Sequence, residues 1–170
     1  MNIEIRKLTI EDYTDLRESM VQAYDTSGNG IWSKASIQNL LNIFPEGQSC
    51  IAVDDKVVAC SLSIIVDYDI FGDNHTYEDI TGKYSFSTHT ASGNVLYGIE
   101  VFVHPEYRGL RLARRLYEAR KELCETLNLE SIIAGGRIPG YHEYAEQLSP
   151  RQYIDKVKAK EIYDPTLTFQ

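Results

Sequence analysis

The sequence predicts an α/β fold in which buried strands and amphipathic helices share one chain. Val95–Val103 is a near-continuous apolar run, as in a strand that is covered on both faces. Apolar residues then recur at helical spacing and predict one buried stripe. This stripe consists of Leu112, Leu116, Ala119, Leu123 and Leu127. A length of 170 residues suits a full core, so we expect residues 1–170 to form a single domain.

The N-terminal part predicts a strand followed by two helices. Ile3–Leu8 alternates enough to be a strand. Thr9, with Asp12 three positions on, resembles the start of a helix with its cap. Ser33 is placed to cap a second helix, which Pro45–Gly47 ends.

A hairpin and a long connection follow. Ser49–Val53 and Lys56–Val66 predict two strands around the turn Asp54-Asp55. The second strand is nearly all apolar or small, so we expect it to be central. Asp67–Gly93 is polar and irregular, and a solvated insertion is the account we expect for most of its residues. Its acidic residues suit a cationic amine substrate, and their spacing lacks the regularity of a metal site.

The segment after Val95–Val103 predicts a phosphate site. Gly98 marks a bulge or a close approach of another backbone, and Pro105 ends the strand. We expect a helix from about Arg108 or Gly109, whose first N–H groups have no partner within the helix. Four arginines surround this end: Arg108, Arg111, Arg114 and Arg115. On a chain of net charge -8, this patch favours a small anionic ligand, and the alternative is a solvated basic helix face.

The C-terminal part predicts further short elements. Glu130–Ala134 is expected to be a short buried strand, and Pro139–Gln147 a short helix. Ser149–Gln152 is typical of a helix start, and this helix is expected to run to about Lys160. Thr166–Gln170 is expected to form one more helix.

Composition excludes several classes of function. The acidic balance argues against general nucleic-acid binding. No run approaches the ~20 apolar residues of a membrane span, and Met1–Ile10 does not resemble a signal peptide. The 3 cysteines are odd in number and lack motif spacing, which fits reduced thiols. We therefore expect a cytoplasmic protein with no nucleic-acid or membrane partner and no metal.

The run from Val101 to Ala113, VFVHPEYRGLRLA, resembles the acyl-CoA-binding motif of the GNAT N-acyltransferases. That motif reads Arg/Gln-x-x-Gly-x-Gly/Ala, and Arg108 and Ala113 match its ends. Arg111 departs from it, because a glycine is usual there, although a guanidinium can itself pair with phosphate. The resemblance implies an acetyl-CoA site made of Val101, Phe102, Val103, Arg108, Gly109, Leu110, Arg111, Leu112, Ala113 and Arg114.

Further segments resemble the GNAT domains that are fused in front of a nitrilase-type carbon–nitrogen hydrolase. These are Arg120–Leu123, Gly135–Tyr141, Ser149–Pro150 and Ile162–Gln170. The resemblance implies a mixed, mostly antiparallel central sheet flanked by helices and lacking the last strands of the fold. The chain is then expected to be a fragment or a natural remnant. Its open sheet edge predicts a homo-oligomer or a C-terminal hydrolase domain as partner.

The implied chemistry is direct acyl transfer from acetyl-CoA to an amine of a small molecule or peptide. Glu100, the only ionisable residue inside Val95–Val103, is the predicted base, because apolar neighbours raise the pKa of a carboxyl group. The alternative is a glutamate at the strand edge that faces solvent. Tyr141 is the predicted acid for the leaving thiolate, and plain packing is its alternative. A non-catalytic acyl-CoA-binding module of a hydrolase fusion and a purely structural domain stay open beside the enzyme.

Overall fold

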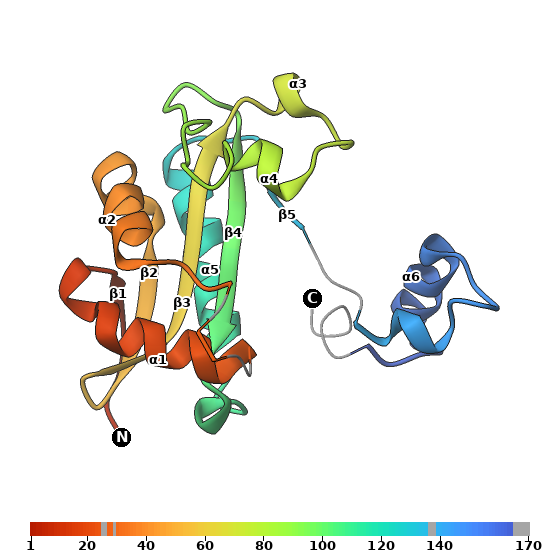
Figure 1. Cartoon of the computed structure of the whole chain (residues 1–170), viewed down its shortest axis with the longest axis horizontal. Helices are drawn as coiled ribbons and strands as arrows, with labels where there is room; N and C mark the ends of the chain where they lie inside the picture. The colour runs from red at the N-terminus through yellow and green to blue at the C-terminus, as the bar shows by residue number, and fades with distance from the viewer. Residues whose placement is uncertain (25–26, 29, 136–138, 165–170) are drawn as a thin grey trace. The chain divides into compact units, whose positions relative to one another are not determined.

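The computed structural model describes residues 1–24, 27–28, 30–135 and 139–164, and it divides into two compact units, Met1–Ala134 and Gly135–Gln170 (Figure 1). The first unit contains one 5-stranded sheet with the strand order β1-β2-β3-β4-β5. The strands are β1 (Ile3–Lys7), β2 (Ser49–Val53), β3 (Lys56–Val66), β4 (Val95–Val103) and β5 (Ser131–Ala134). Neighbouring strands are antiparallel except β4 and β5, which are parallel. The predicted α/β class, the mixed and mostly antiparallel sheet, and the central place of β3 are confirmed.

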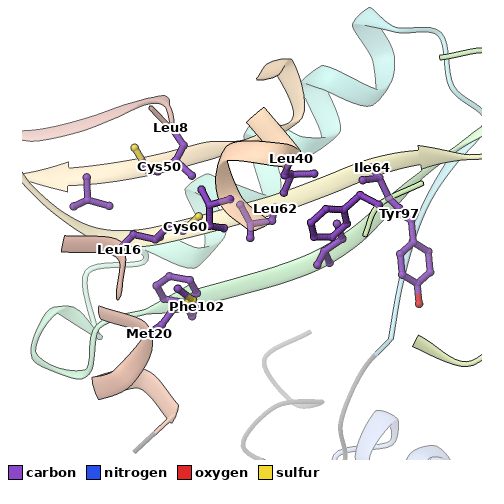
Figure 2. Close-up of a cluster of buried hydrophobic side chains, with 14 of the residues drawn as sticks. Leu8, Leu16, Met20, Leu40, Cys50, Cys60, Leu62, Ile64, Tyr97 and Phe102 are labelled. Carbon is purple, nitrogen blue, oxygen red and sulfur yellow. The ribbon is translucent and has the colours of Figure 1, made fainter. Parts of the chain in front are cut away.

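Helices cover both faces of this sheet. One face, which we call the α1–α2 face, packs against α1 (Tyr13–Tyr24) and α2 (Lys34–Ile43). The other, the α5 face, packs against α5 (Leu112–Thr126). Figure 1 shows α1 and α2 in front of the strands and α5 behind them. Apolar side chains of α1, α2 and the strands form the largest buried cluster, much of which is drawn in Figure 2.

Local signals explain where these elements begin. Asp54 and Asp55 both have positive φ, 47° and 70°, as a two-residue hairpin turn of the primed type requires. Ser33 caps α2, since its hydroxyl accepts the Ser36 N–H at 3.1 Å. A 3-10 turn, Ile10–Asp12, precedes α1, and another, Pro45–Gly47, follows α2.

The long connection between β3 and β4 is partly core. It contains two single-turn helices, α3 (Tyr68–Phe71) and α4 (Tyr77–Ile80). Most of its residues are exposed or half-exposed, as expected for a solvated insertion, but Ile80 and Phe86 are exceptions that are fully buried in the large cluster. These residues are isolated apolar positions without periodicity, which hides their burial in the sequence.

Helix α5 begins later than expected. A 3-10 turn, Pro105–Tyr107, follows β4, and the chain then passes through Gly109 at φ 88° and Arg111 at φ 59°. Neither φ is compatible with a right-handed helix, so α5 starts only at Leu112.

The buried stripe of α5 also differs from the prediction. It consists of Leu112, Leu116, Arg120 and Cys124, while Leu127 is exposed. The prediction placed Ala119 and Leu123 in this stripe, and the structure places Arg120 and Cys124 there instead.

The C-terminal predictions are confirmed in part. Strand β5 is half-exposed rather than buried. In the second unit, Pro139–Glu143 is a 3-10 helix, and α6 (Pro150–Lys158) has the predicted cap, with Gln152 N–H donating to the Ser149 hydroxyl at 3.2 Å. The helix predicted at Thr166–Gln170 lies outside the described residues.

Candidate active site

Strands β4 and β5 run together for only part of their length. Their pairing extends from Val95–Ser131 to Gly98–Ala134 and stops there. His104 N–H donates to Val58 at 2.7 Å, which makes this a hydrogen-bonded pair of the antiparallel β3–β4 ladder. Because such pairs alternate, the backbone groups of Val101 and Val103 point away from β3. On that side of β4, no strand lies beyond Gly98 in the described part of the sheet.

A bulge on β4 lies where this edge begins. Leu62 pairs with Glu100 and Ser63 with Gly98, so Ile99 is the extra residue opposite β3. The bulge predicted near Gly98 is therefore confirmed. One extra residue breaks the alternation of side chains, because Ile99 packs in the cluster of the α1–α2 face and Glu100 reaches residues on that same face.

The Glu100 carboxylate is held by two aromatic donors. The Tyr24 hydroxyl donates to Oε1, and Trp32 Nε1 donates to Oε2 at 3.2 Å. Trp32 is itself fixed, since its carbonyl accepts the Tyr13 hydroxyl at 2.8 Å. Glu100 is half-buried, so the alternative of a solvent-facing glutamate at the strand edge does not describe it.

More aromatic rings surround this carboxylate on the α1–α2 face. The ring centroids of Trp32 and Tyr84 are 6.1 Å apart, and those of Tyr77 and Tyr84 are also 6.1 Å apart. The Tyr77 hydroxyl donates to the carbonyl of Ile99, the extra residue of the bulge, at 3.0 Å. Tyr77 and Tyr84 are exposed, so an aromatic surface lies beside the carboxylate. Sequence reasoning missed these contacts, because they join segments far apart in the chain.

The start of α5 forms a basic surface pocket. We call it the arginine pocket, and it is lined by Leu110, Arg111, Arg114, Arg115 and Glu118. Arg111 is the N-cap residue, and no side chain caps the helix there, so the first N–H groups are available to a ligand. Arg114 Nε lies 3.4 Å from Glu118 Oε1, and both side chains are largely exposed.

Arg108 does not belong to this pocket. Its guanidinium donates to the Ala23 carbonyl of α1 at 3.4 Å. The other residues of the predicted acetyl-CoA site divide between the two faces of the sheet. Val101, Val103 and Leu112 pack together on the α5 face, Phe102 packs on the α1–α2 face, Ala113 is half-buried, and Gly109 forms the turn.

The predicted acid, Tyr141, lies in the second unit. Its hydroxyl donates to the Leu148 carbonyl at 2.7 Å, and its ring lies 5.6 Å from that of Tyr153. Both contacts serve packing within this unit. The catalytic role of Tyr141 stays a prediction.

Other chemistries have little support. Cys50, Cys60 and Cys124 are free and buried, and burial raises the pKa of each thiol, that of Cys50 to about 12. Such thiols are poor nucleophiles at neutral pH. The described residues contain no cluster of three or more His, Cys, Asp or Glu that suits a metal ion. No helix in the described ranges has the length and apolar character that crossing a membrane requires.

Comparisons with known proteins agree with this geometry. The profile of the acetyltransferase (GNAT) family matches residues 13–144. The probable hydrolase YhcX of Bacillus subtilis is 45% identical over 139 residues, which are 82% of this chain but 27% of that protein. The uncharacterized N-acetyltransferase YkwB of the same organism is 32% identical over 82% of this chain and 62% of its own length. The chain thus spans about a quarter of the length of the probable hydrolase and less than two thirds of the length of the second relative.

A solved structure gives the same result for the fold. The loading GNATL domain of CurA from Lyngbya majuscula superimposes with a TM-score of 0.75 at 26% identity, over 91% of this chain and 74% of that one. The family match covers more than half of the chain, and β4, its bulge and the start of α5 all lie inside it. The chain belongs to the acetyltransferase (GNAT) family.

Proposed function

We propose that this chain transfers an acetyl group from acetyl-CoA to an amine acceptor. The observation that carries the proposal is the placement of Glu100 by the β4 bulge, beside the open edge of β4. The arginine pocket lies at the start of the helix that follows the same strand. One strand–turn–helix segment thus carries a base, then an exposed strand edge, then a phosphate site. This order suits acyl transfer from a CoA thioester.

Each part has a role in the proposed reaction. The arginine pocket binds the CoA phosphates through guanidinium groups and helix N–H groups. The outward N–H groups of Val101 and Val103 bind the extended pantetheine arm, and N–H groups near the bulge polarise the thioester carbonyl. Arg108 contacts α1, and its role in binding acetyl-CoA stays a prediction.

Glu100 removes the proton from the acceptor. The neutral amine then attacks the thioester carbon, a carbon–nitrogen bond forms, and the carbon–sulfur bond breaks. Tyr141 donates a proton to the leaving thiolate. The aromatic surface of Trp32, Tyr77 and Tyr84 favours an acceptor that arrives as a cation, because aromatic faces attract ammonium groups.

Calorimetry with acetyl-CoA tests the binding half of this proposal. Wild type is compared with Arg111→Ala combined with Arg114→Ala, and with Lys121→Ala as an exposed control on the same helix. We expect the double variant to bind at least about tenfold more weakly, since each charged contact contributes about 1.5–3 kcal/mol. Equal affinity in all three proteins would contradict the arginine pocket as the phosphate site.

An amine-dependent thiol-release assay tests the transfer. We expect release with a primary amine, and a loss of about 100-fold or more in Glu100→Gln, since general bases contribute about 10²–10⁴-fold. Acetyl-CoA binding should persist in that variant. An unchanged rate would remove Glu100 as the base.

A second function has a specific observation in its favour. The relative of highest identity reported above is a probable hydrolase, and this chain matches 27% of it. The chain would then be an acyl-CoA-binding or regulatory module beside a hydrolase domain. Tight acetyl-CoA binding without thiol release for a broad set of small and peptide amines would support this function over the enzyme.

A further inference from the structure

A buried arginine lies directly under the β4 bulge. Arg120 is 5% exposed and extends from α5 towards the α5 face of the sheet. Its Nη2 donates to the Leu62 carbonyl of β3 at 3.0 Å and to the Glu100 carbonyl of β4 at 3.1 Å. Leu62 and Glu100 are register partners at the point where the β3–β4 ladder shifts. One guanidinium therefore joins the two strands at the bulge.

Gly98 provides the space for this contact. A Cβ atom at Gly98 would lie 2.6 Å from Arg120 Nη1, closer than real Cβ atoms approach, and 3.0 Å from its Cζ, which is a tight contact. The glycine inside β4 thus makes room for the Arg120 side chain and not for another backbone segment. Gly98 and Arg120 act as one pair across the sheet.

Stability alone does not account for an arginine here. Its neighbours in the α5 stripe are Leu112, Leu116 and Cys124, and an apolar residue would continue that stripe. Burial lowers the pKa of Arg120, which reports the desolvation of a cation, although an arginine keeps its charge. Its Nε has no hydrogen-bond partner among the described residues, which is unfavourable for a buried polar atom.

We propose that Arg120 is a positioning residue that holds the β4 bulge and thereby keeps Glu100 on the α1–α2 face. The inference rests on the proposed acyl transfer, in which Glu100 is the base. Without the guanidinium, the two carbonyls at the register shift lose their shared donor. β4 can then return to regular alternation, which turns Glu100 away from Tyr24 and Trp32. Arg120 acts through the backbone and touches no reacting atom.

The test compares Arg120→Lys and Arg120→Met with wild type in the complete chain. Lys121→Met is the matched control, since Lys121 is an exposed neighbour on the same helix. Each protein is assayed for kcat, for KM towards acetyl-CoA and for tryptophan emission. Trp32 is the only tryptophan and donates to Glu100, so its emission reports this contact without any turnover. Glu100→Ala gives the emission of the broken contact.

We expect both Arg120 variants to lose at least about tenfold in kcat, as misplaced catalytic groups do. KM for acetyl-CoA should stay within about twofold, because Arg120 is buried and does not line the arginine pocket. Their emission should move towards that of Glu100→Ala, while Lys121→Met matches wild type. A purely structural residue would lower the melting temperature and leave kcat of the folded protein unchanged.

Two results would overturn the inference. The first is wild-type kcat and emission in a folded Arg120 variant. The second is the failure of both variants to unfold cooperatively, which would make Arg120 a requirement for folding instead. If wild type itself releases no thiol with any amine, the proposed function fails, and the emission of the variants still decides whether Arg120 holds Glu100.

Discussion

His89 shows how one neutral side chain ties the long connection to the sheet. Its Nδ1 accepts the Ile65 N–H of β3 at 3.0 Å, so the ring carries its hydrogen on Nε2. The ring also stacks on Phe44 with centroids 4.8 Å apart. Burial lowers the pKa of His89 from its ordinary 6.5. Protonation would bring an N–H against the Ile65 N–H and break the contact.

This arrangement predicts a loss of stability in mild acid. Below pH 6.5 the unfolded chain binds a proton at position 89 before the folded chain does, so the free energy of unfolding falls as pH falls towards the folded pKa. His89→Asn keeps an acceptor but does not titrate. We expect it to be less stable by about 1 kcal/mol at neutral pH and to show a flatter profile below pH 6.5. The measurement is the unfolding free energy of both proteins across this pH range. Parallel pH profiles in the two proteins would contradict a role of His89 protonation.

Arg111 combines an unfavourable backbone with a useful side chain. Its φ of 59° is the left-handed region, where residues other than glycine lose about 1–2 kcal/mol. The related motif has a glycine here. The guanidinium in the arginine pocket gives a reason to retain an arginine.

We therefore expect Arg111→Gly to be more stable than Arg111→Ala by about 1 kcal/mol while binding acetyl-CoA more weakly than wild type. Denaturation and calorimetry measure the two effects separately. Lys160 also has a left-handed φ, 63°, and Lys160→Gly is the control that should change stability without changing affinity. An Arg111→Gly variant with full affinity would show that the guanidinium does not bind the ligand.

At the scale of elements, an ion pair joins β1 to the start of α1. Arg6 Nη1 and Nη2 donate to the two carboxylate oxygens of Asp12, each at 2.8 Å, and the Thr9 N–H donates to Asp12 at 2.9 Å. The hydrogen bond from Arg6 is the main reason why the pKa of Asp12 is lowered from 3.8. The strand and the helix entrance are thereby held in one geometry.

Asp12→Asn removes the charge of this pair. We expect a loss of about 1 kcal/mol at neutral pH, since the pair is partly exposed. In wild type this contribution is present above pH 3.8 and disappears as pH falls through the lower folded pKa. The difference in unfolding free energy between the two proteins should therefore shrink in acid. A constant difference down to pH 3 would contradict an electrostatic origin.

Elements with strong local signals could be predicted from the sequence. The apolar run of β4, the Asp54-Asp55 turn and the caps at Ser33 and Ser149 depend on neighbours in the chain, and all are confirmed. The start of α5 could not be predicted, because a left-handed arginine leaves no signal in a sequence. The burial of Arg120 could not be predicted either, because the spacing of the leucines favours a purely apolar stripe on α5.

The candidate site could be predicted only in part, for the same reason. Glu100 can be found in the sequence because it is the single charge in a predicted buried strand, and Gly98 indicates the bulge. Tyr24 and Trp32 could not be assigned to it, because they lie 76 and 68 residues away from Glu100 in the chain. Only tertiary packing of α1 and α2 against the sheet brings them to the carboxylate.

At the scale of the whole molecule, the large apolar clusters formed by the described residues lie in the first unit. Their members lie between Ile3 and Ile133, and in the described part of the second unit the buried apolar side chains are Tyr153 and Val157. The arginine pocket and the open edge of β4 also belong to the first unit. The second unit carries Tyr141.

A fragment of residues 1–135 is therefore expected to fold cooperatively and to bind acetyl-CoA about as tightly as the whole chain. Amine-dependent thiol release should fall by about 10²-fold or more if Tyr141 is the acid. Calorimetry, denaturation and the release assay on both proteins check these outcomes, with Tyr141→Phe in the whole chain as the control. Equal release by fragment and whole chain would exclude an acid from the second unit.

The bulge on β4 acts as a change of phase in an otherwise periodic strand, much like a dislocation in a crystal. On one side of Ile99 the odd-numbered side chains face the α1–α2 helices, and on the other side the even-numbered ones do. If the bulge closed with Ile99 kept in the ladder, Glu100 to Val103 would each shift by one position along β3 and turn to the opposite face, whereas deletion of Ile99 would leave those four side chains on their present faces. The faces of these four side chains therefore depend on Ile99 staying outside the ladder and not on their own identity.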